Sequence, residues 1–201
     1  MPLIRSVSGV RGIVDAACGQ PVTLTPEVTA DLGRAFATYL RRQADPGSGP
    51  AGCALGALDG RPGGARLLEA FSLGTAECGL GVVPLGIVTT PGTALAVCEY
   101  AGTLGVAGGV VITASHNPQQ WNGLKMLLTG GGAPSAEQAA TIFDICDRGA
   151  FDRVDPETLA PRPDIPDVHE LHLTRVLAQV RPETIRARRF RVILDSINGA
   201  G

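Results

Sequence analysis

The residues best suited to chemistry in this sequence lie in Thr113–Pro118, which reads TASHNP. The segment closes an apolar run that begins at Val106, so Ser115 is expected in an exposed turn at the end of a buried strand. His116 can exchange protons near neutral pH. Backbone N–H groups in such a turn can point at an anion, and Lys125 follows ten residues after Ser115 as a point charge able to reach back.

These residues alone leave several interpretations open. The segment could be a plain strand-to-loop turn that happens to carry a surface serine. It could instead be an anion site in which Ser115 and His116 take part in chemistry. A serine hydrolase is disfavoured, because the sequence contains no G-x-S-x-G elbow.

The elements that must position this turn alternate between strand and helix. Apolar runs predict strands at 53–58, 81–88, 106–113 and 124–128, and apolar periodicity predicts helices at 64–78, 90–101 and 135–149, after a first helix that begins at Thr25-Pro26-Glu27. Thr90 is expected to cap the 90–101 helix, and Ser135 with Gln138 forms a predicted capping box. The order predicts an α/β fold with a mixed, mostly parallel sheet and helices on both faces. The TASHNP turn then lies at the carboxyl end of a strand, where such sheets usually bind ligands.

The chain is predicted to divide near a proline-rich stretch. We assign residues 1–154 to one domain and 155–166, which holds four prolines, to an interdomain linker. Residues 167–201 are interpreted as the truncated start of a second α/β domain, with a helix and then a strand at Phe190–Leu194. A strand without a following partner cannot bury itself, so this last part is expected to need further chain.

Composition restricts the possible partners. The net charge of −2 gives no electrostatic reason to expect nucleic acid or an anionic membrane as a partner. No apolar run reaches the length of a membrane span. The five cysteines are odd in number and form no C-x-x-C pair, which disfavours a disulfide framework or a thiolate zinc site and suits the cytoplasm.

Four segments together resemble the α-D-phosphohexomutases, the family of phosphoglucomutases, phosphomannomutases and phosphoglucosamine mutases. The TASHNP turn with Asn122–Lys125 (NGLK) resembles the active-serine signature of that family. Ser8–Gly12 (SGVRG) resembles its amino-terminal loop, and we interpret this stretch as a flexible loop with Arg11 at its tip. Asp59–Arg61 resembles its D-x-R segment, although Pro62-Gly63-Gly64 follows where serines are common, and 192–201 resembles the opening of its second domain.

The resemblance implies a phosphoenzyme mechanism. Ser115 would carry a phosphoryl group and exchange it with a hexose monophosphate through a hexose bisphosphate. Arg11 and Lys125 are implied near the transferring group, with Lys125 in acid–base work and His116 in support. Mg²⁺ is the implied cofactor, with Ser115 as a metal ligand through its phosphate.

The same resemblance implies further domains, which carry the remaining aspartate ligands of the metal. The remaining domains of the full-length chain are therefore expected partners, and residues 1–201 alone are predicted to be inactive.

Two other functional readings stay open, a non-catalytic phosphosugar-binding module and an unrelated serine enzyme. Arg61 is interpreted as a structural salt-bridge partner. His169 and His172 are spaced to pair on a metal, but no third ligand is evident nearby, which favours a solvated helix face.

Overall fold

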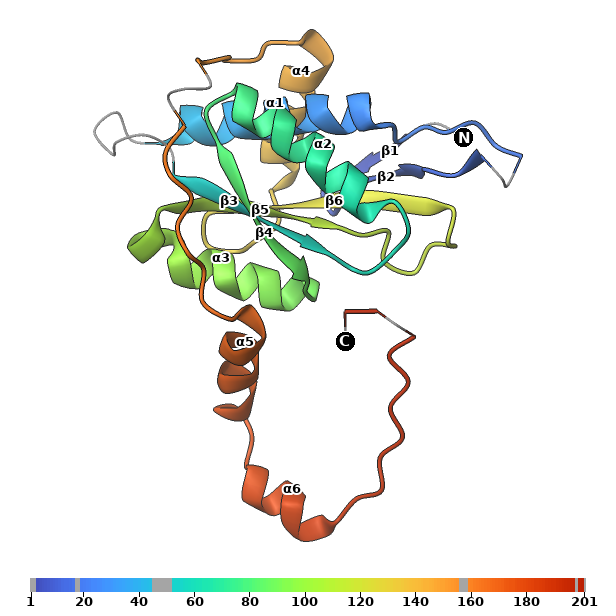
Figure 1. The fold of residues 1–201 in the computed structure, drawn as a ribbon, viewed down its shortest axis with the longest axis vertical. Helices are drawn as coiled ribbons and strands as arrows, with labels where there is room; N and C mark the ends of the chain where they lie inside the picture. The colour runs from blue at the N-terminus through green and yellow to red at the C-terminus, as the bar shows by residue number, and fades with distance from the viewer. Residues whose placement is uncertain (1–2, 17–18, 45–51, 156–158, 198, 201) are drawn as a thin grey trace.

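A six-stranded sheet covered by helices on both faces forms the main body of the chain (Figure 1). The computed structural model describes residues 3–16, 19–44, 52–155, 159–197 and 199–200. The strands are β1 (Ile4–Ser6), β2 (Gly9–Ile13), β3 (Cys53–Leu58), β4 (Gly81–Ile87), β5 (Val106–Ile112) and β6 (Trp121–Leu128). Their order across the sheet is β1-β2-β6-β5-β3-β4.

The predicted mixed α/β sheet is confirmed, but its parallel part is smaller than expected. β3 pairs in parallel with β4 and β5, whereas β5–β6, β6–β2 and β2–β1 are antiparallel. The sheet is therefore not mostly parallel. The cause is local, because the chain returns from β5 to β6 through the short segment 113–120, and a short connection can join only antiparallel neighbours.

The expected flexible loop around Arg11 is also corrected. Gly9–Ile13 forms β2, which pairs with β6 on one side and with β1 on the other. Arg11 therefore sits within a paired strand and not at the tip of a loop. Local sequence hid this strand, since its two glycines weaken a strand pattern and its main partner lies far along the chain.

Helices α1 (Pro26–Gln43), α2 (Gly64–Glu77) and α4 (Ala136–Arg148) cover one face of the sheet, and α3 (Thr90–Leu104) covers the other (Figure 1). The caps at Thr25 and at Ser135–Gln138 are confirmed. The predicted cap at Thr90 is wrong by one residue. Thr89 caps α3, and its Oγ1 accepts from the N–H of Gly92 at 3.2 Å.

Helices α1 and α2 approach closely enough to require glycine at their contact. A Cβ on Gly74 would lie 2.0 Å from the carbonyl oxygen of Ala30, and a Cβ on Gly33 would lie 2.5 Å from that of Phe71. The fully buried Phe36 and Phe71 rings pack beside this contact, with centroids 5.9 Å apart. The missing side chains thus let the two helices form one layer over β3, β5 and β6.

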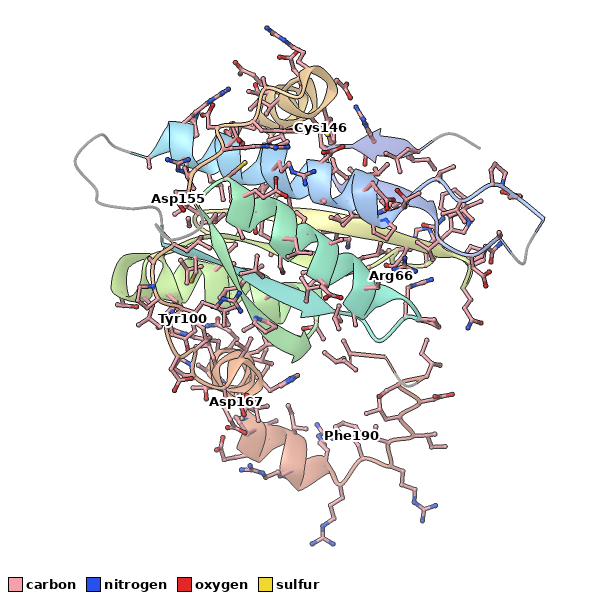
Figure 2. The ribbon with its side chains drawn as sticks, turned by 45° about the horizontal axis from the view of Figure 1, so that its top comes forward. Arg66, Tyr100, Cys146, Asp155, Asp167 and Phe190 are labelled. Atoms are coloured by element: carbon pink, nitrogen blue, oxygen red, sulfur yellow. The ribbon has the colours of Figure 1, made fainter. Side chains whose placement is uncertain are left out.

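The chain leaves the main body after residue 177. α5 (Val168–Leu177) packs on α3, where Arg175 pairs with Glu99 at 2.5 Å, and α6 (Pro182–Arg188) follows it. Figure 2 shows Phe190 far from the sheet. The predicted strand at Phe190–Leu194 is not formed, and Ile193 is 98% exposed. A strand requires a neighbour for its N–H and C=O groups, and none pairs with it within the described residues.

Of the helices in the described residues, none combines the length and the apolar character needed to cross a membrane. The division into domain, linker and second-domain start stays a prediction. Residue 155 and residues 159–166 carry no helix or strand, and residues 156–158 lie outside the described chain.

We predict that Gly74→Ala destabilises the protein by about 1–3 kcal/mol, because the new methyl group must push α1 from α2. The measurement is the free energy of unfolding from urea titration. Gly102→Ala in α3 is the matched control, since a Cβ there meets no atom within 4 Å. Alanine is the better helix former, so the control should be neutral or up to about 1 kcal/mol more stable. Equal effects of the two changes would contradict the close-contact explanation.

Candidate active site

Ser115 lies in the turn between β5 and β6, in the segment 113–120, and is exposed. Its backbone has φ 59°, a left-handed conformation that is uncommon for a residue with a side chain. Two bonds hold the turn locally. The N–H of Ser115 donates to Oγ1 of Thr113 at 3.0 Å, and the N–H of Asn117 donates to the carbonyl of Ala114 at 3.2 Å. Such strained positions gather at functional sites, where the surrounding structure offsets a cost of about 1–3 kcal/mol.

His116 lies next to Ser115 and is exposed as well. Its Nδ1 is 3.5 Å from Oγ of Ser115, which is the outer limit of a hydrogen bond. The imidazole is therefore near the hydroxyl without being fixed to it. This position suits the expected supporting role better than that of a tightly held base.

Arg11 and Lys125 share one face of the sheet. Arg11 pairs with Gly123 across β2 and β6, and Lys125 is two residues further along β6. Residues paired across strands, and residues two apart on a strand, point to the same side. The Arg11 side chain runs across Gly123, because a Cβ at Gly123 would lie 3.1 Å from Cγ of Arg11.

This row of residues leads to the serine turn. The N–H of Thr113 donates to the carbonyl of Gly123 at 2.9 Å, so the glycine that Arg11 crosses is bonded to the residue that holds Ser115. Lys125 pairs with Val111 at the end of β5. Both cations are half-buried, and neither forms a salt bridge with a carboxylate within the described residues. The structure thus places two positive charges on one face of the sheet, Lys125 on the strand next to β5 and Arg11 on the strand after it.

Arg61 is the site residue whose importance the sequence did not reveal. The expected salt bridge exists, between Nε of Arg61 and Oδ2 of Asp59 at 3.1 Å. In addition, the guanidinium donates to the backbone carbonyls of Ser115, Asn117, Pro118 and Trp121. The parallel pairing of β3 and β5 explains how it arrives there, because Leu58 and Ile112 are register partners at the strand ends. The D-x-R segment was the only sequence signal for this role.

A hollow opens beside the serine turn. It is lined by 59–62, by Thr113, Ser115, Asn117 and Gln119, and by Ser196, Ile197, Gly199 and Ala200. Figure 1 shows the C-terminal segment turning back from α6 toward the main body. The segment that resembles the opening of a second domain therefore comes next to Ser115.

A model of the family "Phosphoglucomutase/phosphomannomutase, alpha/beta/alpha domain I" matches residues 3–153. The chain belongs to this family. It is 31% identical over 192 residues to a phosphoglucomutase of Neisseria gonorrhoeae. This match covers 96% of this chain and 36% of the relative. It is 34% identical over 194 residues to a phosphoglucosamine mutase of Pediococcus pentosaceus, covering 96% of this chain and 40% of the relative.

A solved structure shows the same family likeness. The crystal structure of a phosphoglucomutase/phosphomannomutase family protein from Burkholderia thailandensis superposes with a TM-score of 0.67 at 26% identity. The superposition covers 89% of this chain and 37% of the Burkholderia thailandensis chain. The resemblance found in the sequence is thereby confirmed, and the chain spans about 36–40% of the length of the curated relatives quoted above.

The phosphoglucomutase/phosphomannomutase domain does not hold a complete metal site within the described residues. No group of three or more His, Cys, Asp or Glu side chains gathers in the described residues, at Ser115 or around His169 and His172. Among the described residues that line the hollow, Asp59 alone has a carboxylate, and that carboxylate is already bonded to Arg61. A divalent cation at Ser115 would need most of its oxygen ligands from elsewhere.

We predict that Thr113→Val loosens the serine turn without unfolding the domain. The change removes the acceptor for the Ser115 N–H, a bond worth about 1 kcal/mol. Hydrogen exchange followed by mass spectrometry should show the amides of 114–117 exchanging about fivefold faster. Thr129→Val, which removes an exposed bond to the carbonyl of Ala107, is the matched control and should leave this peptide unchanged. Unaltered exchange in Thr113→Val would show that the bond does not hold the turn.

Proposed function

We propose that this chain carries the phosphoryl-transferring serine of a phosphohexomutase. The reaction interconverts hexose 6-phosphate and hexose 1-phosphate through phosphorylated Ser115 and a hexose bisphosphate. One observation carries the proposal. Ser115 is exposed at the end of β5, and the cations Arg11 and Lys125 lie on the paired strands β2 and β6, where neither forms a salt bridge within the described residues. The relatives are named as phosphoglucomutases and phosphoglucosamine mutases, which is consistent with this chemistry.

Charge explains why the cations are needed. A phosphoserine carries about −1.5 to −2 charges at neutral pH, and a hexose phosphate brings a similar charge. Phosphoryl transfer depends mainly on positioning the groups and stabilising their charge. Arg11, fixed within β2, and Lys125, fixed within β6, supply positive charge from two neighbouring strands of one rigid sheet.

A proton must move in each transfer. The attacking sugar hydroxyl loses one, and the departing serine oxygen gains one. We assign this acid–base work to Lys125, with His116 orienting the serine hydroxyl from its position beside it. Lys125 is half-buried next to Val111, near the end of the strand that leads to Ser115.

Mg²⁺ is the proposed cofactor, and members of this family are generally metal-dependent. The phosphate on Ser115 is the ligand that this chain would offer, and the other ligands would come from the remaining domains of the full-length protein. When bound, the ion would offset charge on the phosphoryl oxygens. The substrates are assigned as a class, hexose monophosphates and bisphosphates, because the relatives differ in the sugar that their names specify.

We also assign the protein to the cytoplasm. Cys53, Cys78, Cys98 and Cys146 are free thiols, as expected for a reducing compartment, and Cys18 lies outside the described residues. Burial raises the pKa of the Cys53, Cys78 and Cys146 thiols, so these three stay protonated and unreactive at neutral pH.

We predict that Ser115→Ala, made in the complete gene product, lowers mutase turnover to background. Folding should be nearly unchanged, because an exposed hydroxyl contributes little to packing. The measurements are a coupled mutase assay and phosphopeptide mass spectrometry, which should find phosphate on Ser115 of the wild type. Ser72→Ala in α2 is the control and should keep full activity. Turnover by Ser115→Ala would overturn the assignment, and sugar-phosphate binding without turnover by the wild type would favour a non-catalytic binding module.

We predict that Lys125→Gln lowers kcat by about 10²–10⁴-fold, the usual contribution of a general acid or base. Arg11→Gln should lower kcat/KM as well, because it removes charge that the phosphate needs. Arg148→Gln on α4 is the control for loss of one charge, since that side chain is 72% exposed and distant from the serine turn. If all three variants behaved alike, the cations on the sheet face would have no special part in the reaction.

A further inference from the structure

The guanidinium of Arg61 is devoted to the turn that carries Ser115. Nη2 donates to the carbonyls of Ser115 at 2.7 Å and Asn117 at 2.8 Å, and Nη1 donates to those of Pro118 at 3.0 Å and Trp121 at 3.3 Å. Nε is bonded to Asp59. All three nitrogens are therefore already engaged, and Arg61 holds no free group for a substrate phosphate.

Asp59 fixes the arginine from behind. Its Oδ1 accepts from the backbone N–H of Arg61 at 3.1 Å, and its own N–H donates to the carbonyl of Ile112 at 3.2 Å. The two side chains are only 18% and 21% exposed, so water screens their attraction weakly. Gly60, with φ 87°, allows the tight turn between them. Asp59 and Arg61 thus form a hydrogen-bonded pair that is attached to the end of β5.

The Asp59–Arg61 pair determines the direction in which the carbonyl groups of the serine turn point, and therefore which side of the turn can face a phosphate. Carbonyl oxygens are the negative ends of peptide dipoles, and an oxyanion beside them is repelled. Arg61 donates hydrogen bonds to four of these carbonyl oxygens, so they point toward the guanidinium and its positive charge offsets their partial negative charge. The left-handed backbone of Ser115 turns its carbonyl toward the arginine, so the bond at 2.7 Å stabilises a conformation that would otherwise be costly.

We propose that Arg61, held by Asp59, is a positioning residue for phosphoryl transfer at Ser115. It keeps the serine in its left-handed conformation and keeps the carbonyls of the turn away from the phosphate. It touches neither the phosphate nor the sugar. The kinetic part of this inference rests on the proposed mutase function, whereas the structural part concerns the turn alone.

Lysine cannot replace arginine in this role. The guanidinium is a planar fork with five N–H donors, which matches one carboxylate and four carbonyls at fixed angles. An ammonium group keeps the charge but has three donors around a single point. Arg61→Lys therefore separates positioning from charge.

The test compares Arg61→Lys and Asp59→Asn with Arg66→Lys in the complete gene product. Arg66 lies in the first turn of α2 and is exposed, which makes it a matched control (Figure 2). We expect Arg61→Lys to lower kcat by about 10²-fold, the effect of a small misplacement of a reacting group. KM should stay within about threefold, and Asp59→Asn should show a smaller fall in kcat. Arg66→Lys should match the wild type.

Hydrogen exchange of the peptide spanning 113–121 provides the second readout, together with circular dichroism to confirm folding. Faster exchange of this peptide in Arg61→Lys, but not in Arg66→Lys, is expected whether or not the protein is a mutase. Wild-type kcat or unchanged exchange in Arg61→Lys would overturn the proposal. A rise in KM at unchanged kcat would also overturn it, because it would show that Arg61 binds substrate. Absence of turnover in the wild type, with faster exchange in Arg61→Lys, would instead contradict the mutase function alone.

Discussion

In the proposed function the hydroxyl of Ser115 accepts a group that carries about −1.5 to −2 charges, and this electrostatic constraint explains the arrangement around it. Cations have to be near, and lone-pair acceptors have to point elsewhere. The structure achieves the first condition with Arg11 and Lys125 on one sheet face, and the second by bonding the carbonyls of the turn to Arg61. Positive charge paired with a carboxylate is no longer available to a phosphate. Arg61 is paired in this way, whereas Arg11 and Lys125 form no salt bridge within the part of the chain that the structure describes.

The antiparallel return of β6 is what unites these parts. A parallel connection would have needed a long crossover and would have carried Lys125 away from the turn. The short return places Lys125 opposite Val111, and it lets β2 add Arg11 on the next strand. The parallel half of the sheet contributes from the other side, since β3 ends beside β5 and delivers Asp59 and Arg61. The serine turn lies where the two halves meet.

Sequence predicted the elements whose signals are local, and missed those whose causes are distant. The apolar run before Ser115 and the capping box at Ser135 act over a few residues, so both were predicted correctly. The strand around Arg11 exists through its pairing with β6, and its glycines resemble a loop. The run at Phe190–Leu194 shows the reverse case, since its apolar pattern favours a strand but no partner in the described chain completes one. Arg61 was interpreted as structural because its carbonyl partners cannot be read from side-chain types.

Holding the turn through backbone carbonyls has a consequence if Ser115 is phosphorylated and dephosphorylated in turn, as the proposed function requires. In that proposal the charge at Ser115 changes by about 1.5 to 2 units each time the phosphoryl group leaves or returns. If the cations that balance the phosphate also shaped the turn, the turn would lose its support at every departure. Arg61 binds uncharged carbonyls and Asp59, and none of these takes part in the proposed phosphoryl transfer. The turn can therefore keep one geometry with and without the phosphoryl group, while Arg11 and Lys125 balance the negative charge of that group when it is present.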